Sequence, residues 1–201
     1  MKQILWMLLA YLVGSVPWGL VIGKVFYHTD IRDYGSGNLG GTNAGRVLGA
    51  PLGILVILLD GFKSFLFMAL CNRYAPGMEP YCGLAVCLGH CFPIFAGFRG
   101  GKAVACSYGY LLGLAVFVTH HFLLTYFLPF AVFVIVLFLS SIVSLSSMCG
   151  ISSAAIGIFL FVDRKIGMLV TALALFVIYR HRANISRILQ GKESKITLFK
   201  K

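Results

Sequence analysis

The chain has 201 residues, of which 59% are hydrophobic and only 11% are charged, whereas charged residues make up about a quarter of an ordinary soluble domain. Its 17 Lys and Arg against 6 Asp and Glu give a formal net charge of +11. A chain this apolar offers little soluble surface for a basic groove, which argues against nucleic-acid binding; positive loops of a membrane protein explain the charge better.

Seven apolar stretches follow one another and predict an all-α, polytopic membrane protein with about seven transmembrane helices in a single domain, residues 1–201. They cover residues 4–26, 51–71, 81–98, 103–118, 122–143, 145–162 and 166–179. A helix needs about 20 residues to cross the hydrocarbon, with about 17 as a practical minimum. The fourth and seventh stretches therefore need flanking residues, and we expect Arg180 and Arg182 to reach toward the interface.

The first stretch begins like a secretory signal peptide, because Lys2 precedes an apolar core. The apolar run continues well past Pro17, however, and no small-x-small cleavage site follows. We therefore expect an uncleaved first helix.

The basic residues predict the orientation of the chain in the membrane. Seven helices place the termini on opposite sides, and cytoplasmic loops of membrane proteins carry the excess of Lys and Arg. With the C-terminus inside, the outer segments hold only four basic residues, Lys2, Arg73, Arg164 and Lys165. The inner segments then hold twelve: Lys24, Arg32, Arg46, Arg99, Lys102, Arg180, Arg182, Arg187, Lys192, Lys195, Lys200 and Lys201. The prediction is an outer N-terminus and a cytoplasmic C-terminus.

The six cysteines all lie in apolar stretches. Cys87, His90 and Cys91 share one helical face and would offer metal ligands, but the chain has no CxxC pair and no obvious fourth ligand. Small buried residues of a membrane helix are the better interpretation. We expect neither a metal site nor a disulfide.

A glycine-rich loop, "YGSGNLGGTNAGR" (34–46), precedes the second apolar stretch. Glycines let successive backbone amides turn toward an anion, while Ser36, Asn38, Thr42 and Asn43 add side-chain donors. The N-terminus of the helix that follows would strengthen anion binding. The loop lacks the GK-[ST] ending of a Walker motif. A flexible loop of turn-forming residues is the alternative.

Two further polar segments fall on the same predicted side. In "GHCFPIFAGFRGGK" (89–102), two glycines precede Lys102 at the expected start of the fourth membrane helix, where free amides and a cation suit a phosphate. In "YRHRANISRILQGKE" (179–193), a helix would place Arg180, Asn184 and Arg187 in one stripe, with His181 beside it. An ordinary positive loop and a basic helix lying on anionic lipid are the respective alternatives.

Asp60 and Lys63 lie three residues apart inside the second apolar stretch. Charges at membrane depth are costly and call for a partner. We predict that the two form a buried ion pair that braces the site.

Six patches along the chain resemble, in order and at compatible spacing, the motifs of the PlsY family of bacterial acyl-phosphate:glycerol-3-phosphate acyltransferases. They are "GSVPWG" (14–19), "GSGNLGGTN" (35–43), "DGFK" (60–63), "LGHCFPIFAGFRGGKAVA" (88–105), "SLSS" (144–147) and "YRHRANISRILQGKE" (179–193). The chain departs from that pattern at Gly41, where alanine is common, and at Ser64 and Ala103, where glycine is usual. It also lacks the basic or aromatic residue often found before "SLSS", at Ser141 or Ile142.

The resemblance implies transfer of a fatty acyl group from acyl phosphate to the 1-hydroxyl of glycerol 3-phosphate, which gives lysophosphatidic acid and inorganic phosphate. This is the first acylation of bacterial phospholipid synthesis, on the cytoplasmic side of the cell inner membrane. It implies no cofactor, contact with membrane lipid, and a substrate handed over by an acyl-phosphate-forming enzyme. The implied catalytic residues are His90, Lys102, His181 and Asn184. The implied substrate-binding residues are Ser36, Gly37, Asn38, Gly40, Thr42, Asn43, Arg46, Gly100, Gly101, Ser144, Arg182 and Arg187.

The proton acceptor is open between His90, His181 and a substrate phosphate oxygen. The substrate phosphate is favoured because neither histidine has a carboxylate nearby in the sequence. "HTDIRD" (28–33) matches the His-x4-Asp motif of another glycerolipid acyltransferase class, but so short a pattern arises easily by chance.

Two other functions fit parts of the sequence. A transporter of a phosphorylated metabolite would show repeated halves and a midplane site, and no repeat is visible. A membrane phosphatase would need a nucleophile or metal ligands that six acidic residues hardly supply.

Overall fold

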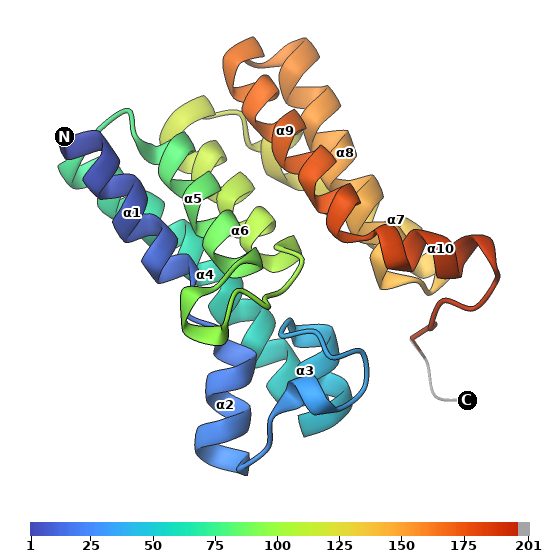
Figure 1. Ribbon diagram of the computed structural model, residues 1–201. Coiled ribbons are helices and arrows are strands. Elements are labelled where there is room, and N and C mark those ends of the chain that lie inside the picture. The colour runs from blue at the N-terminus through green and yellow to red at the C-terminus, as the bar shows by residue number, and fades with distance from the viewer. Residues whose placement is uncertain (197–201) are drawn as a thin grey trace. The chain divides into compact units, whose positions relative to one another are not determined.

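The computed structural model describes residues 1–196, and its backbone contacts divide into two compact units, residues 1–113 and the part that begins at Leu114 (Figure 1). Each unit is described by itself. Every regular element within residues 1–196 is helical, which confirms the all-α prediction. Lys200 and Lys201, counted above among the inner basic residues, lie outside the described residues.

The first unit contains six α-helices and two short 3-10 turns, with its last helix reaching the boundary. They are α1 (Lys2–Gly14), α2 (Trp18–Tyr27), η1 (Ile31–Asp33), α3 (Gly41–Leu48), α4 (Ala50–Tyr74), α5 (Glu79–Cys91), η2 (Ile94–Ala96) and α6 (Val104–Leu114).

The first apolar stretch forms two helices instead of one. α1 ends at Gly14 and α2 begins at Trp18, and their axes differ by 42°. Pro17 lies in the break, where its missing N–H and its clash with the preceding turn prevent a continuous helix. The break leaves backbone carbonyls without helical partners, and one of them takes part in the candidate site described below.

Helices α1, α4 and α5 pack through small residues and a shared apolar core (Figure 1). A Cβ atom at Gly89 of α5 would overlap the backbone of α1 at Tyr11, so only glycine permits the observed approach. Close backbone contact at small residues is the usual way in which membrane helices associate. The core of this group consists of Ala10, Phe67, Cys71, Cys82 and Val86.

A second core fixes the glycine-rich loop to the helices around it. Ile31, before the loop, and Leu39, in the middle of it, are 0% and 2% exposed and pack with Leu20, Ile22, Ala44, Val56 and Ala96. Burial of two large apolar side chains stabilises the loop by several kcal/mol, at roughly 1.5–3 kcal/mol each. The loop is therefore anchored just before its start and at its middle, unlike the flexible loop considered above.

The second unit is built on three long helices that follow one another in the chain, α8 packing against both α7 and α9. Its elements are the π-helical segments η3 (Ala115–Thr119) and η4 (Leu123–Phe127), then α7 (Leu128–Ser140), α8 (Val143–Phe161), α9 (Arg164–Arg180) and α10 (Arg182–Leu189). Ser141 ends α7 in a left-handed conformation, and the Asp163 carboxylate caps α9 by accepting a hydrogen bond from the N–H of Ile166 (2.8 Å).

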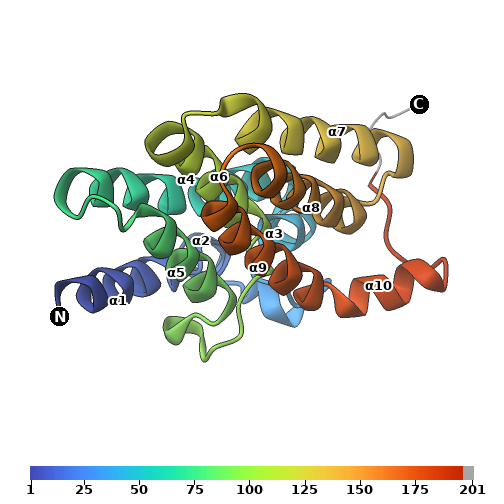
Figure 2. The ribbon, with the colours of Figure 1, turned by 90° about the horizontal axis from the view of Figure 1, so that it is seen from above.

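The chain bends by 59° between α9 and α10, at His181 (Figure 2). The predicted single stripe of Arg180, Asn184 and Arg187 is therefore wrong. Arg180 is the last residue of α9, whereas Asn184 and Arg187 belong to α10 and lie three residues apart on it.

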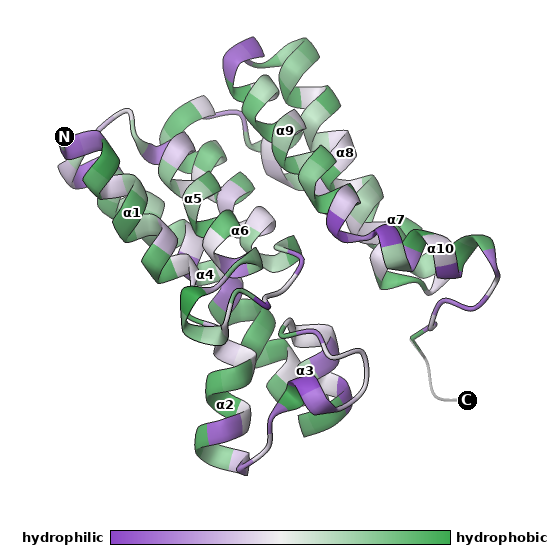
Figure 3. Cartoon of the chain, viewed as in Figure 1, coloured by the Kyte–Doolittle hydropathy of each residue, from purple (hydrophilic) through white to green (hydrophobic). Residues whose placement is uncertain are grey.

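All seven apolar stretches coincide with helical elements, and the helices are coloured mostly as hydrophobic residues (Figure 3). Within the described residues, three helices are long and apolar enough to cross a membrane, or five if each bent pair counts as one span. Those three are α4, the continuous segment Leu123–Ser140, and α8. The number seven and the orientation remain predictions.

Candidate functional site

The centre of the first unit contains the predicted buried ion pair. Lys63 Nζ lies 2.7 Å from Asp60 Oδ1, and the two side chains are only 5% and 2% exposed. Lys63 also donates to the carbonyl oxygen of Val16 (3.0 Å), in the break between α1 and α2. The pair thus ties α4 to the interrupted first span.

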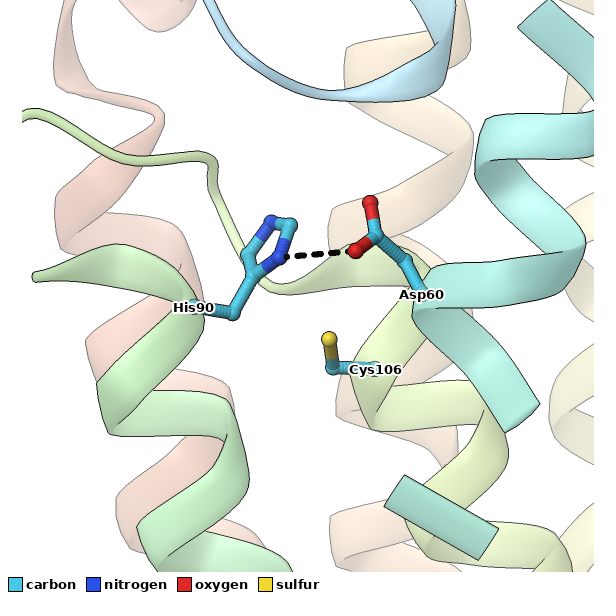
Figure 4. Close-up of side chains that lie close together, drawn as sticks. All are labelled: Asp60, His90 and Cys106. Atoms are coloured by element: carbon cyan, nitrogen blue, oxygen red, sulfur yellow. Dashed lines mark ion pairs between the residues drawn. The ribbon is translucent and has the colours of Figure 1, made fainter. Parts of the chain in front are cut away.

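His90 completes this cluster from the last turn of α5. Its Nδ1 atom lies 3.3 Å from Asp60 Oδ1 (Figure 4). The same atom lies 3.1 Å from Lys63 Nζ, so it either accepts from the ammonium or donates to the carboxylate. The expectation that His90 has no carboxylate nearby, which came from its sequence neighbours, is therefore wrong, because Asp60 of α4 lies beside it in the folded chain. Thirty residues separate the two, and only the packing of α4 against α5 brings them together.

A third ligand-type side chain, Cys106 of α6, lies beside Asp60 and His90 (Figure 4). Their potential ligand atoms all fall within 4.8 Å of one another. This set differs from the Cys87, His90 and Cys91 set considered from the sequence. The Lys63 ammonium already lies within hydrogen-bonding distance of both Asp60 and His90, so the positive charge that the carboxylate requires comes from lysine. We interpret the cluster as an ion-pair network.

The Gly-Gly-Lys turn is built directly on His90. The N–H of Gly101 donates to the carbonyl oxygen of His90 (3.0 Å), and a Cβ atom at Gly101 would overlap the His90 ring at Nε2. The Gly101 amide is thus used to shape the turn, which corrects the expectation that it faces an anion. Lys102 is half-buried and lies just before α6, as predicted. A Cβ atom at Gly100 would overlap the His90 carbonyl oxygen.

Ala103 follows this turn in a left-handed conformation, with φ of 61°. That region of backbone space costs an L-residue about 1–2 kcal/mol and favours glycine. The geometry explains why glycine is usual at this position in the PlsY pattern.

Asn43 organises the glycine-rich loop from inside. It is 2% exposed, its Oδ1 accepts from the N–H of Ser36 (2.8 Å), and its Nδ2 donates to the carbonyl of Ile31 (2.8 Å). Both ends of its amide are therefore occupied within the loop, so Asn43 acts as a support. Asn38 is also used locally, since its Oδ1 accepts from the N–H of Gly40 (2.9 Å), and the Gly37 N–H donates to Tyr34.

The outer surface of the loop carries the groups that remain exposed. Ser36, Thr42 and Arg46 are exposed. Gly40 is the N-cap of α3, a separate short helix that follows the loop. The expected helix N-terminus is thus present, but it belongs to α3 instead of the membrane helix α4. Amides at such a terminus favour anions.

His28 and Asp33 do not form a pair in the described structure. Both side chains are exposed, and no hydrogen bond joins them within residues 28–33. The acidic residue engaged here is Asp30, which binds Arg32 through both carboxylate oxygens (2.9 and 2.6 Å). The hydrogen bonds with Arg32 hold the pKa of Asp30 well below its usual range, despite partial desolvation. This arrangement favours the interpretation of "HTDIRD" as a chance match.

The second unit has its own polar cluster, centred on Glu193. This carboxylate accepts hydrogen bonds from Ser144 Oγ (2.8 Å), Asn184 Nδ2 (2.5 Å) and Arg187 Nε (2.7 Å). Burial by itself would raise the pKa of Glu193, but these hydrogen bonds outweigh it and hold the pKa below its ordinary value. One implied catalytic residue, Asn184, and two implied substrate-binding residues, Ser144 and Arg187, therefore share one internal carboxylate.

Glu193 is the residue that sequence reasoning missed. It stands at the end of the third polar segment, and the available signal was that it is the single acidic residue after Asp163. A lone carboxylate in a basic tail has several cations within reach. Attention to charge pairing would have found it.

The other implied residues of this unit lie around the bend. His181 is 2% exposed, and its Nδ1 lies 2.8 Å from the carbonyl oxygen of Val177. Because a carbonyl only accepts, Nδ1 carries the proton. Arg182 is exposed and stacks over the ring of Tyr179, with 4.7 Å between the guanidinium carbon and the ring centroid.

Comparison with known proteins places this chain in a family. A profile of the family described as glycerol-3-phosphate acyltransferase matches residues 4–191. The glycerol-3-phosphate acyltransferase of Listeria monocytogenes is 47% identical over 197 residues, covering 96% of each chain, and that of Geobacillus kaustophilus is 46% identical over 192 residues, covering 94% of each. The chain therefore belongs to the glycerol-3-phosphate acyltransferase family.

Two solved structures resemble the fold closely. Both are crystal structures of PlsY, described as an integral membrane glycerol 3-phosphate acyltransferase. Its glycerol 3-phosphate form is 32% identical with a TM-score of 0.88, and its lysophosphatidic acid form is 31% identical with a TM-score of 0.85. Each match covers 98% of this chain and 96% of the other. The resemblance to the PlsY family is thus confirmed.

The Glu193 cluster makes stability depend on pH. A carboxyl whose pKa is depressed by folding stabilises the protein above its unfolded pKa, about 4.3, and loses that contribution as pH falls through the folded value. We expect Glu193→Gln to lower the melting temperature at neutral pH, with a deficit that shrinks steadily below about pH 4. Thermal unfolding in detergent across that range measures it.

The matched control is Asp33→Asn, which removes an exposed carboxylate and should leave the melting temperature nearly unchanged at either pH. A Glu193→Gln deficit that stayed constant from neutral to acid pH would show that the carboxylate charge contributes nothing.

Proposed function

We propose that the protein transfers a fatty acyl group from acyl phosphate to the 1-hydroxyl of glycerol 3-phosphate, which gives lysophosphatidic acid and inorganic phosphate. The observation that carries this proposal is the match to glycerol-3-phosphate acyltransferases over almost the whole chain. The acceptor and product are those in the descriptions of the two PlsY structures. The chain would act in the inner membrane as one domain, with its polar segments on the cytoplasmic side.

The balance of charge supports the choice of two phosphate-bearing substrates. Each phosphate carries about 1.5–2 negative charges near neutral pH, so the reaction brings three to four together. Cations able to offset them occur in both units, and six acidic residues in the chain leave a large positive excess. Arg46 and Lys102 belong to the first unit, and Arg187 and the residues around the α9–α10 bend to the second.

The chemistry needs no covalent intermediate on the enzyme. The 1-hydroxyl oxygen attacks the carbonyl carbon of the mixed anhydride, a tetrahedral oxyanion forms, and the C–O bond to phosphate breaks. Phosphate departs as an anion without prior protonation, while the hydroxyl proton passes to a base. Positioning and electrostatic stabilisation of the oxyanion supply the rate enhancement.

We propose that a substrate phosphate oxygen accepts the hydroxyl proton. The His90 ring is enclosed by Lys63 and Asp60 at Nδ1 and by Gly101 at Nε2. His90 then serves by holding the Gly-Gly-Lys turn, while Lys102 contacts the substrates. The acyl donor would come from a separate acyl-phosphate-forming enzyme, and no cofactor takes part.

Lys102, Arg46 and Asn184 should each be needed for turnover. We expect Lys102→Ala, Arg46→Ala and Asn184→Ala each to lower kcat/KM by roughly ten- to a hundredfold, since a charge-assisted contact contributes about 1.5–3 kcal/mol. Steady-state kinetics with purified variants measure this, with size-exclusion profiles to show that they fold.

The contrasting variants are His28→Ala and Asp33→Asn, which should keep most of their activity. Normal activity in the first three variants together with inactive His28 and Asp33 variants would replace this proposal with the His-x4-Asp mechanism.

The donor specificity follows from the need for phosphate next to the carbonyl. An acyl thioester has no phosphate at the bond that breaks, so the anion-binding groups would hold nothing there. We expect rapid turnover with acyl phosphate and little with acyl-coenzyme A or acyl carrier protein. The assay is lysophosphatidic acid formation by purified protein, free of acyl-phosphate-forming enzymes. Equal rates with acyl-coenzyme A would refute this donor assignment.

A further inference from the structure

A basic cavity in the first unit lies outside all the residues assigned above. It has a volume of about 490 Å³ and is lined by Leu20, Lys24, Arg32, Phe95, Ala96, Gly97 and Arg99. The lining comes from α2, from η1, and from the loop between α5 and α6. Cavities of roughly 300–1,000 Å³ accommodate small ligands.

The cavity carries a net charge of +2. Asp30 neutralises one of the three cations, because it binds Arg32 through both oxygens and Lys24 Nζ at 3.2 Å. Arg32 Nη1 also donates to the carbonyl of Ala96 (3.4 Å), which fixes the guanidinium against the loop. Arg99 adds a further charge, and its side chain is exposed. The site therefore suits an anion of one or two charges.

Large apolar side chains are exposed along the same segment. Phe95 lines the cavity and is 62% exposed, and its sequence neighbours Ile94 and Phe98 are 47% and 57% exposed, although all three lie between α5 and α6 and not in a membrane helix. Phe98 adopts a left-handed backbone conformation, with φ of 60°, which is costly for a bulky residue. The surrounding structure thus holds large apolar side chains outward beside three cations.

This combination is characteristic of the boundary between a bilayer and water. Basic side chains there attract anionic headgroups, while exposed aromatic and aliphatic side chains enter the acyl region. Lys24 lies on the last turn of α2, which together with α1 is apolar enough for one bent span, so its ammonium can reach the headgroup level. A soluble phosphate would need the cations but not the exposed apolar side chains.

We propose that Lys24, Arg32 and Arg99 bind the phosphate of an anionic diacyl phospholipid of the bilayer, whose tails lie against Ile94, Phe95 and Phe98. Because Arg99 directly precedes Gly100, a lipid bound here holds the loop next to the Gly-Gly-Lys turn at the membrane surface. The site is separate from that of either substrate.

The test is a titration of purified protein with phosphatidylglycerol and, separately, with phosphatidylcholine, with bound lipid counted by native mass spectrometry. We expect a preference for phosphatidylglycerol that falls by about fivefold in Arg99→Gln and by a similar factor in Lys24→Gln. The loss of one basic residue at an anionic membrane surface lowers the affinity for anionic lipid by about this factor. The preference should be restored in Arg99→Lys. Arg73→Gln, which removes an exposed cation from the last turn of α4, should behave like wild type.

Kinetics and soluble ligands distinguish the sources of phosphate. The KM for glycerol 3-phosphate should stay within about twofold of wild type in Arg99→Gln, a change worth less than one charge-assisted contact. Inorganic phosphate near that KM should not displace phosphatidylglycerol. Phosphatidylglycerol binding that is equal in wild type and variants would overturn the proposal. So would a raised KM with unchanged lipid binding, or a cavity that takes lysophosphatidic acid in preference to phosphatidylglycerol.

Arg99→Gln alone decides the matter if Lys24→Gln fails to fold. The Arg99 side chain is exposed, and its loss leaves Asp30 with both of its partners.

Discussion

The buried charges of α4 are the constraint on which the first unit depends. Moving a carboxylate and an ammonium out of water costs several kcal/mol for each ion, and loss of one partner from such a pair typically costs about 3–5 kcal/mol. Asp60 and Lys63 offset this cost with each other, with His90, and with the Val16 carbonyl exposed by the break at Pro17. His90 then carries the Gly-Gly-Lys turn through its own carbonyl and ring.

The polar residues of the motifs divide into supports and surface groups. Asn43 and Glu193 are supports, because their polar atoms are bound within the loop and within the α10 cluster respectively. Arg46 is a surface group with an exposed side chain. The motifs thus contain residues that shape them and residues with exposed side chains, and we expect mutation of either kind to lower activity for different physical reasons.

The elements and the Asp60–Lys63 pair could be predicted because both depend on local spacing. Hydrophobic runs locate the helices. Two opposite charges three residues apart on one helix are neighbours, so pairing with each other offsets the free-energy cost of burying them. The contact of His90 with Asp60 could not be predicted, since it depends on the packing of α4 against α5. The Glu193 cluster was missed for the same reason: it needs the bend at His181 and a return of the chain toward Ser144. The sequence of a motif therefore did not show which of its side chains are supports, because that depends on contacts with residues far away in the chain.

We infer that the buried Asp60–Lys63 pair positions the proposed phosphate-binding turn, beyond its contribution to stability. The measurement is kcat/KM for glycerol 3-phosphate in the double variant Asp60→Leu with Lys63→Met, in which apolar residues of similar size replace both charges. Such replacements commonly leave stability unchanged or improved, so the thermal unfolding of the variant should match wild type. We expect a loss in kcat/KM of at least about tenfold, equivalent to about 1.4 kcal/mol of transition-state stabilisation. A stable double variant with wild-type kcat/KM would contradict it.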